Sequence, residues 1–365
     1  MWPLSRPAPS VLPAWSNPAA LLSEAWRVFG EWREQRERAR MPARPTRQPS
    51  LPPSLSQPLA LSNPILPALA ALIPLLRGAL HVCILDPLAR GLIRVPRTGA
   101  SAADERKVSK FAESAWKCLA YATLFTLGVL ALSGSPWAPA PLGAPGSTLA
   151  SARVAVWATG WPAAVALSPA AARYWTAQAA FYLSSLISLF AWEHRRSDFG
   201  VMVAHHLTTL ALIGGASLAR LEGPGITVAA LHDPADIFLE GAKVASYAGF
   251  HSLATLCFVA LALTWGATRL CVLPLLAADA WRAGCGGGAG LWARHAPPHI
   301  PAAKPLSILL WALVAMHTYW FALIARIAAG QLFGGEGRVT RDVREEDEVE
   351  ENEVEAVVLE KEGMK

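Results

Sequence analysis

The chain has 365 residues, of which 53% are hydrophobic and only 16% are charged, and its formal net charge is +5 at pH 7. Soluble domains are about 25% charged, so this composition argues against a pair of ordinary soluble domains. The chain also lacks a basic surface with interleaved aromatic side chains, and we therefore expect no nucleic-acid partner. Composition favours a protein of the lipid bilayer.

The two ends of the chain differ from its middle. Residues 1–58 are rich in Pro, Arg and Ser, and we predict a disordered leader there. Within it, the apolar side chains of residues 21–40 fall broadly on one side of a helix, either a short helix in solution or one on a membrane surface. The run 336–365 is acidic, and we predict a disordered tail.

The region between these ends, 59–335, consists of long apolar blocks. A membrane-spanning helix needs about 20 mostly apolar residues. The candidate blocks lie near 60–85, 113–133, 150–168, 172–192, 200–221, 224–248, 250–276 and 305–330. Trp161-Pro162 interrupts the third block, which we interpret as a re-entrant or interfacial piece. The sequence thus predicts an all-α, polytopic transmembrane bundle of about seven helices, within a range of about six to eight.

Ionisable side chains interrupt two consecutive apolar blocks. His205-His206 lie in one of them, and the run HDPAD, residues 232–236, lies in the next. On insertion scales an Asp, Lys or Arg at the centre of a bilayer costs about 2.5–3.5 kcal/mol, so such residues usually have a partner or a function. This concentration of proton-carrying groups indicates chemistry rather than anchoring.

In the first of these blocks the spacing separates the two histidines. If a helix begins near Asp198, then His205 lies two turns later on the same face, and Thr209 one turn further. His205 and His206 point about 100° apart on such a helix, so they cannot act in the same way on one substrate atom.

The second block carries a polar stripe. Asp233, Asp236, Glu240 and Lys243 follow a 3, 4, 3 spacing that places them along one side of a helix, and His232 is spaced for an i,i+4 contact with Asp236. Such a stripe must face the interior of the bundle or a wet cavity. We expect it to face the histidines of the preceding helix.

Histidine beside a carboxylate suits proton transfer. An imidazole ionises near pH 6.5, and a carboxylate bonded to it fixes its tautomer and stabilises its charged form. This pair fits acyl transfer to an amine or alcohol, in which the nucleophile must lose a proton. A histidine could also attack the activated acyl group itself and form an acyl-imidazole. The residues leave both roles open.

Two alternatives compete with acyl transfer. The HH and HDxxD runs contain metal-ligand types, as in soluble metal-dependent phosphohydrolases, but the HxxxH and HxxHH boxes of membrane di-iron enzymes are missing. A structural polar network without catalysis is the other alternative. We expect no metal site and no cofactor. The isolated residues His81, His251 and His317 are interpreted as core or interfacial, and the five cysteines as packing residues.

The segment from Trp192 to Tyr247 resembles the Lag1 motif of ceramide synthases, within the TRAM–Lag1–CLN8 (TLC) domain. The resemblance is carried by WEHRRSDFGVMVAHHLTTLALI, closest to the plant or algal type, and by LHDPADIFLEGAKVASY. KFAESAWKCLAY, WATGWP and LLWALVAMHTYWFALIARI also match the family, and the similarity covers about 75–340.

This resemblance implies a multi-pass sphingoid base N-acyltransferase of the endoplasmic reticulum, which transfers an acyl group from acyl-CoA to sphinganine or phytosphingosine. The essential histidines of the family correspond to His205 and His206, and its essential acids to Asp233 and Asp236. Acyl-CoA, the long-chain base and the bilayer are the implied partners, and a homo- or heterodimer with other ceramide synthases is a further expectation.

Further residues are assigned to substrate binding. Arg195 and Arg196 are placed to meet the phosphates of coenzyme A, or equally to anchor the helix by the positive-inside rule. The remaining assignments are Asp198, Thr209, His232, Glu240 and Lys243.

The chain departs from the family at two places near the histidine motif. Ala216-Ser217 replaces a Ser-Tyr pair, and Gly223 replaces an arginine. These changes concern substrate preference and level of activity more than reaction type. A non-catalytic TLC protein that binds or translocates lipid is the alternative function, and the intact HH and HDxxD set favours the enzyme.

Overall fold

The structure is a computed structural model that describes residues 64–135, 137–139, 142–143, 145–157, 167–191, 197–286 and 299–333, with the backbone alone for the last three residues. The predicted leader and acidic tail lie outside these ranges. Within them every regular element is helical, which confirms the predicted all-α class.

Seven long helical runs make up the described part of the chain. They are Ile65–Ile93 (α2, Ile65–Leu80; η3, His81–Leu85; α3, Asp86–Ile93), α4 (Ala102–Leu132), α6 (Pro169–Ala191), α7 (Phe199–Leu218), α8 (Glu222–Tyr247), His251–Cys285 (α9, His251–Trp265; η4, Gly266–Val272; α10, Leu273–Cys285) and α11 (Ala303–Phe333). Five of them are long and apolar enough to cross a membrane. The more polar helices α6 and α8, with 23 and 26 residues, are also long enough to cross a membrane. The arrangement agrees with the predicted number of about seven.

The re-entrant or interfacial interpretation of the block near 150–168 stays a prediction, because Trp161-Pro162 lies outside the described residues. The described part of this block is α5, Leu149–Trp157, a helix of nine residues. This helix is too short to span a bilayer, which needs about 20 residues. Residues 158–166 lie outside the described ranges.

Local sequence explains where these helices begin and bend. Ser101 caps α4, because its Oγ accepts a hydrogen bond from the backbone N–H of Asp104 at 3.1 Å. The two longest composite runs contain a π-helical segment instead of a break. The segment η4 places Arg269 in the core, where it is 3% exposed. Such π-bulges are frequent at functional sites.

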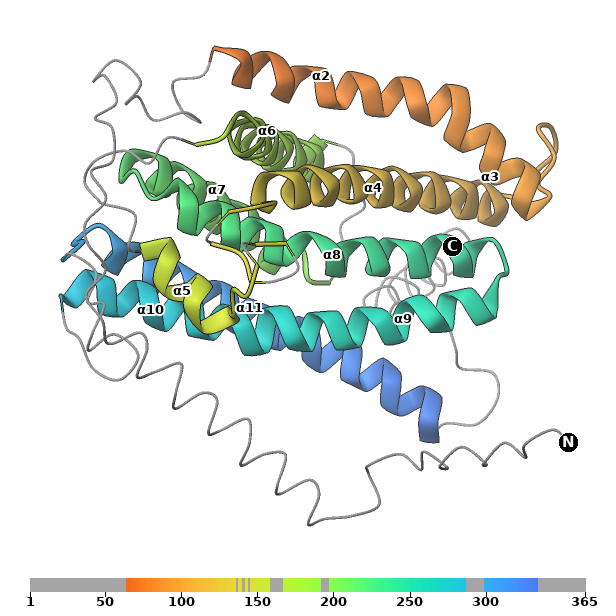
Figure 1. Ribbon diagram of the computed structural model, residues 1–365. Coiled ribbons are helices and arrows are strands. Elements are labelled where there is room, and N and C mark those ends of the chain that lie inside the picture. Colours follow the sequence, from red (N-terminus) through yellow and green to blue (C-terminus); the bar gives the residue numbers. More distant parts are fainter. Residues whose placement is uncertain are drawn as a thin grey trace, which may run out of the picture. The chain divides into compact units, whose positions relative to one another are not determined.

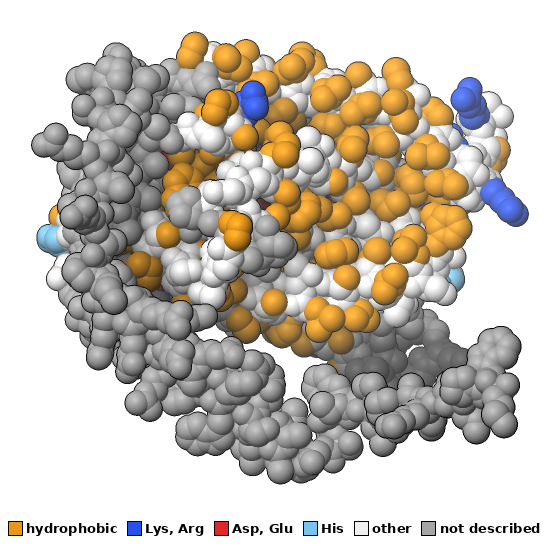
Figure 2. All heavy atoms as spheres, in the orientation of Figure 1, with side chains coloured by type: hydrophobic (Ala, Val, Ile, Leu, Met, Phe, Trp, Pro, Cys, Tyr) orange, Lys and Arg blue, Asp and Glu red, His pale blue; other side chains and the backbone are white. Residues whose placement is uncertain are grey.

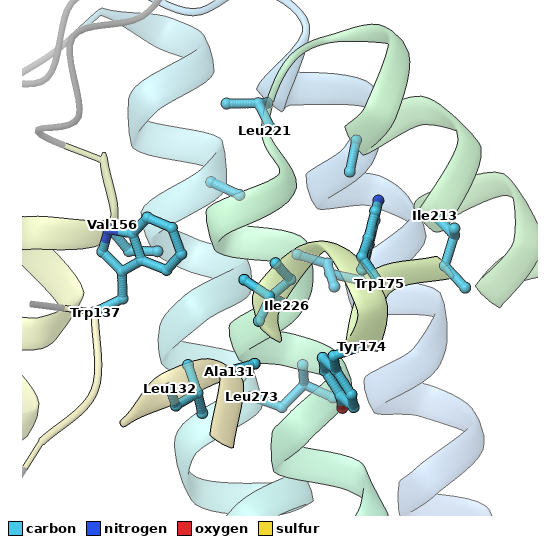
Figure 3. Close-up of a cluster of buried hydrophobic side chains, with 14 of the residues drawn as sticks. Ala131, Leu132, Trp137, Val156, Tyr174, Trp175, Ile213, Leu221, Ile226 and Leu273 are labelled. Carbon is cyan, nitrogen blue, oxygen red and sulfur yellow. The ribbon is translucent and has the colours of Figure 1, made fainter. Parts of the chain in front are cut away.

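Helix α8 has the largest number of neighbours in the bundle. It lies between α4 and α9 and also contacts α6, α7 and η4, as the ribbon diagram shows (Figure 1). A buried apolar cluster holds α6, α7 and α8 together, and these helices contribute Trp175, Ile213 and Ile226 to it, respectively (Figure 3). The polar residues of α8 are therefore surrounded by helices rather than by lipid.

The outer surface of the helices is strongly apolar. Leu75, Val82 and Leu263 each expose about 70% of their surface, and Figure 2 shows hydrophobic side chains spread over the described residues of one face, with only a few basic ones. Exposed apolar area of this extent is typical of a surface that contacts lipid. The chain is a multi-pass membrane protein.

Candidate active site

The two histidines of α7 lie beside a tyrosine of α6. The rings of His205 and His206 are 5.7 Å apart and almost perpendicular, and Tyr182 lies 6.3 Å and 5.9 Å from them. The helix begins at Phe199, directly after Asp198, as predicted. The carboxylate of Asp198 is 2% exposed and accepts a hydrogen bond from Trp320 Nε1 at 2.9 Å.

His206 has a defined tautomer. Its Nδ1 lies 2.8 Å from the carbonyl oxygen of Met202, one turn earlier on α7. Because a carbonyl only accepts, Nδ1 must carry the proton, and Nε2 is then the basic nitrogen of the neutral ring. This contact also fixes the orientation of the ring on the helix.

His205, in contrast, has no hydrogen bond within the described part of the chain. Its Nδ1 is buried without a partner, and so is the hydroxyl of Thr209 one turn further along α7. The ring is held by edge-to-face contacts, with its centroid 5.4 Å from that of Trp320 and 5.6 Å from that of His317. Buried polar groups are normally paired, so these open positions are where a bound ligand would contribute.

His232 of α8 is paired with a histidine of α11. Its Nδ1 donates to the carbonyl of Val228 at 2.7 Å, and its Nε2 lies 3.0 Å from Nε2 of His317. Since the Nδ1 of His232 carries the proton, its Nε2 accepts from His317. The Nδ1 of His317 is then an unprotonated nitrogen, and it is buried without a partner among the described residues. The sequence predicted a core or interfacial role for His317, and missed this pairing.

Asp236 is bound to an arginine rather than to a histidine. Arg269 of η4 donates from Nη2 to Asp236 Oδ2 at 2.6 Å and to the backbone carbonyl of His232 at 2.9 Å. Its guanidinium also lies 3.9 Å from the ring centre of Trp265. The predicted i,i+4 contact between His232 and Asp236 is therefore wrong, because each side chain has a nearer partner on another helix.

Asp233 faces α6. Its carboxylate accepts hydrogen bonds from the hydroxyl of Tyr174 at 2.7 Å and from Nε2 of Gln178 at 2.9 and 3.0 Å. All three side chains are buried. The stripe of α8 thus divides, with Asp233 directed toward α6 and Asp236 toward η4. The sequence had suggested a hydrogen bond between a carboxylate of this stripe and a histidine. Within the described residues, neither Asp233 nor Asp236 forms one.

Two of the other predicted substrate-binding residues lie on the last part of α8, beyond His232. Glu240 and Lys243 pair with each other at 3.3 Å, further along α8. Arg195 and Arg196 lie outside the described residues. No group of three or more His, Cys, Asp or Glu side chains within the described ranges is arranged to hold a metal ion.

His205 and His232 line an apolar cavity that is open on one side. It contains about 840 Å³ of empty space, counting its open side. Along α7 its wall runs from His205 to Ala216, which is about 16 Å at the rise of an α-helix. Apart from Tyr182, Thr209, Thr227 and the two histidines, most of the lining is apolar. A space of this length and polarity fits an alkyl chain whose polar end lies at the histidines.

Several residues of the site were not identified from the sequence, because each is isolated in an apolar block. Gln178 and Arg269 are polar residues within predicted spans, which was the signal available. Tyr174, Tyr182 and Trp320 offered no such signal, because aromatic residues are common in spans.

The fold and this site define a class: a polytopic helical membrane protein with histidines at the end of a chain-sized apolar cavity. A family model described as the TLC domain matches residues 110–326. Ceramide synthase LOH1 of Arabidopsis thaliana is 32% identical over 305 residues, which cover 78% of this chain and 90% of that protein.

Two further relatives are also plant proteins. Ceramide synthase 1 LOH3 of Arabidopsis thaliana is 30% identical over 81% of this chain and 94% of its own length. ASC1-like protein 3 of Oryza sativa subsp. japonica is 31% identical over 68% and 81%. The chain belongs to the TLC-domain family of ceramide synthases.

The two departures from the family pattern, Ala216-Ser217 and Gly223, lie at the end of the cavity that is remote from the histidines. Ala216 lines the cavity, and Ser217 accepts a hydrogen bond from Trp175 Nε1 at 3.0 Å. At Gly223 the ring of Trp137 lies 3.5 Å from where a Cβ would stand. Both positions are therefore packed against tryptophans, away from the reacting groups.

Proposed function

We propose that this protein is a sphingoid base N-acyltransferase that transfers a fatty acyl group from acyl-CoA to the amine of sphinganine or phytosphingosine, and so forms a ceramide. Relatives that cover most of the chain are named ceramide synthases. The observation that carries the proposal is the position of His205, which has an unpaired buried nitrogen and lines a cavity suited to an alkyl chain.

The reaction needs a base at that position. A sphingoid amine is largely protonated near neutral pH, and its lone pair becomes available only after the ammonium proton is removed. His205 accepts this proton, the amine forms its bond to the thioester carbon, and the carbon–sulfur bond breaks. The departing thiolate takes a proton to become the free thiol. In the second role the imidazole of His205 bonds to the thioester carbon and the carbon–sulfur bond breaks, so that the coenzyme A thiolate departs with a proton. The amine then bonds to the acyl carbon as the carbon–imidazole bond breaks, which frees His205.

The neighbouring residues support His205 rather than replace it. His206 is oriented by Met202, and His317 of the His232–His317 pair lies 5.6 Å from the His205 ring. Asp236 and Arg269 hold the α8 backbone at His232 through the carbonyl of that residue. Asp233 fixes α6, which carries Tyr182. In this arrangement the two acids are positioning residues.

Coenzyme A is polyanionic and stays at the aqueous surface, where Arg195 and Arg196 bind its phosphates. The protein resides in the membrane of the endoplasmic reticulum and pairs with itself or another ceramide synthase. It requires no metal or other cofactor, so activity persists in a strong chelator. Acyl-CoA is the donor, and a free fatty acid does not replace it.

The test uses microsomes from a host that lacks its own ceramide synthases. The full chain is expressed there, and sphinganine is supplied with labelled acyl-CoA or, in a parallel arm, with labelled free fatty acid. We expect labelled ceramide from acyl-CoA alone. Labelled ceramide at the level of an empty vector, with the protein present at normal amount, would refute the proposal. Equal incorporation from the free fatty acid would refute the assigned donor.

A further inference from the structure

The short helix α5 forms one wall of the cavity, although it cannot span a membrane. Val156 and Trp157, at its end, both line the cavity and are buried, at 2% and 4% exposure. The helix contacts α10 and α8, and Figure 1 shows it lying across α10. Its place in the bundle is therefore set by side-chain contacts rather than by the length of the bilayer.

The strongest of these contacts is an ion pair with α10. Arg153 donates from Nε and Nη2 to the two carboxylate oxygens of Asp279 at 2.6 and 2.8 Å. Asp279 is fully buried and also accepts from Arg282 at 3.2 Å. A bidentate contact between a guanidinium and a carboxylate fixes both the distance between the two groups and their relative orientation. The pair thus sets the position of α5 against α10.

This ion pair and the cavity wall belong to the same face of each helix. Val156 and Trp157 follow Arg153 by three and four residues, so the three side chains share one side of α5. On α10, Leu276 precedes Asp279 by three residues and also lines the cavity. A shift of α5 at the ion pair would consequently move its part of the cavity wall.

The wall made by α5 is remote from the histidines. In Figure 3 Val156 is drawn beside Trp137, and both belong to one buried cluster. The ring of Trp137 packs on Gly223 in the first turn of α8. His232 lies nine residues later on that helix, about 14 Å away along its axis. An alkyl chain that starts at the histidines would therefore reach α5 with its far end.

We propose that α5 is the chain-length stop of this cavity, with Val156 and Trp157 as the contact surface and the Arg153–Asp279 ion pair as the device that fixes its position. This inference rests on the proposed function for its substrate, since the ligand is an alkyl chain of the acyl donor or of the sphingoid base. Arg153 and Asp279 act as positioning residues and do not touch the ligand.

The first experiment measures chain-length preference. Microsomes with Trp157→Ala or Val156→Ala receive a series of saturated acyl-CoAs with fixed sphinganine, and then a series of bases with fixed acyl-CoA. We expect the ratio of longer to preferred chains to rise at least about tenfold in one of the two series, the discrimination that one methylene can bring in an apolar pocket. The series that responds identifies which chain occupies the cavity.

Control variants distinguish a change in chain-length preference from a general loss of protein stability. Trp281→Ala, two residues after Asp279 and 41% exposed, removes a tryptophan that does not line the cavity and should leave the profile unchanged. Arg153→Met should broaden the profile, and Arg153→Lys, which keeps the charge without the bidentate contact, should broaden it less. Unchanged profiles in both Trp157→Ala and Val156→Ala, with normal turnover, would overturn the inference.

A second experiment needs no turnover, so it distinguishes failure of this inference from failure of the proposed function. Purified protein is labelled with an acyl-CoA or a sphingoid base that carries a photoreactive diazirine at the end of its chain, and the labelled peptides are identified by mass spectrometry. We expect one of these probes to label α5. Ceramide formation with labels only outside α5 would overturn the inference alone, whereas labelling of α5 without ceramide formation would overturn the function alone.

Discussion

Asp233 and His205 lie in neighbouring helices of the same core, yet their hydrogen bonding is opposite. Both oxygens of Asp233 accept hydrogen bonds from side chains of α6. His205 forms none within the described ranges and lines the cavity. A buried group with all its partners holds helices together, whereas a buried group without them is completed by a ligand. The comparison therefore distinguishes Asp233, which holds the helices of the site in place, from His205, which is available to a substrate.

His205→Ala should have the largest effect on turnover. The variant removes the open nitrogen, and general acid–base groups commonly contribute at least about a hundredfold to rate. We expect ceramide formation to fall by that factor or more in the microsomal assay, with unchanged protein amount. His251→Ala, which changes an exposed histidine on α9, is the control. Turnover within about tenfold of the wild type would contradict the assignment of His205.

Asp236→Asn should have the largest effect on stability. It leaves the guanidinium of Arg269, which is 3% exposed, without its charged partner. Removal of one partner of a buried ion pair typically costs about 3–5 kcal/mol. We expect a clear fall in the unfolding temperature of the purified protein in detergent, together with loss of turnover.

The double variant Asp236→Leu with Arg269→Met tests the cause of that loss. It removes both charges, so it should recover part of the stability without recovering the activity. The ion pair between Arg90 and Glu105 offers a control, because the Glu105 side chain is 45% exposed and Glu105→Gln should change the unfolding temperature little. Equal effects of Asp236→Asn and Glu105→Gln would contradict the buried role of Asp236.

Asp233→Asn should have a smaller effect than Asp236→Asn. The new amide brings an N–H group against the donors of Tyr174 and Gln178, and one of them loses its acceptor. A buried donor left unpaired costs about 1–3 kcal/mol. Thermal unfolding should register this loss, and turnover should remain well above that of His205→Ala. Turnover as low as that of His205→Ala would place Asp233 in the chemistry itself.

Thr209→Val should have the smallest effect. The hydroxyl of Thr209 has no partner in the described part of the chain, so its removal should leave stability unchanged or slightly increased. If the hydroxyl binds substrate, KM should rise about two- to tenfold, the range of one neutral hydrogen bond. Steady-state kinetics with both substrates measures this change. An unchanged KM for both would remove Thr209 from the substrate-binding residues.

Much of the fold could be predicted because periodicity and apolar length are local properties. The long helices follow from runs of apolar residues that a bilayer selects by length alone. The start of α7 after Asp198 and the positions of His205 and Thr209 on it were likewise accessible from spacing. The family followed from the motif that spans Trp192 to Tyr247, which is long and fixed in its spacing.

The partners of the polar residues could not be predicted in the same way. Spacing placed His232 and Asp236 one turn apart, but a contact between them competes with partners on other helices that a sequence does not locate. His317 and Arg269 lie 85 and 37 residues from His232. Arg269 reaches it because η4 packs against α8, and His317 reaches it because α11 packs against α7, α9 and η4.

The sequence by itself determined that this chain spans a membrane as helices and carries histidines and acids within two of them, because apolar length and residue spacing act along the chain. The tertiary structure alone decided which of these groups is paired and which is open, and where the cavity ends. Those outcomes depend on which helices pack together, and a hydrogen bond or an ion pair forms only between groups that packing brings within about 3 Å.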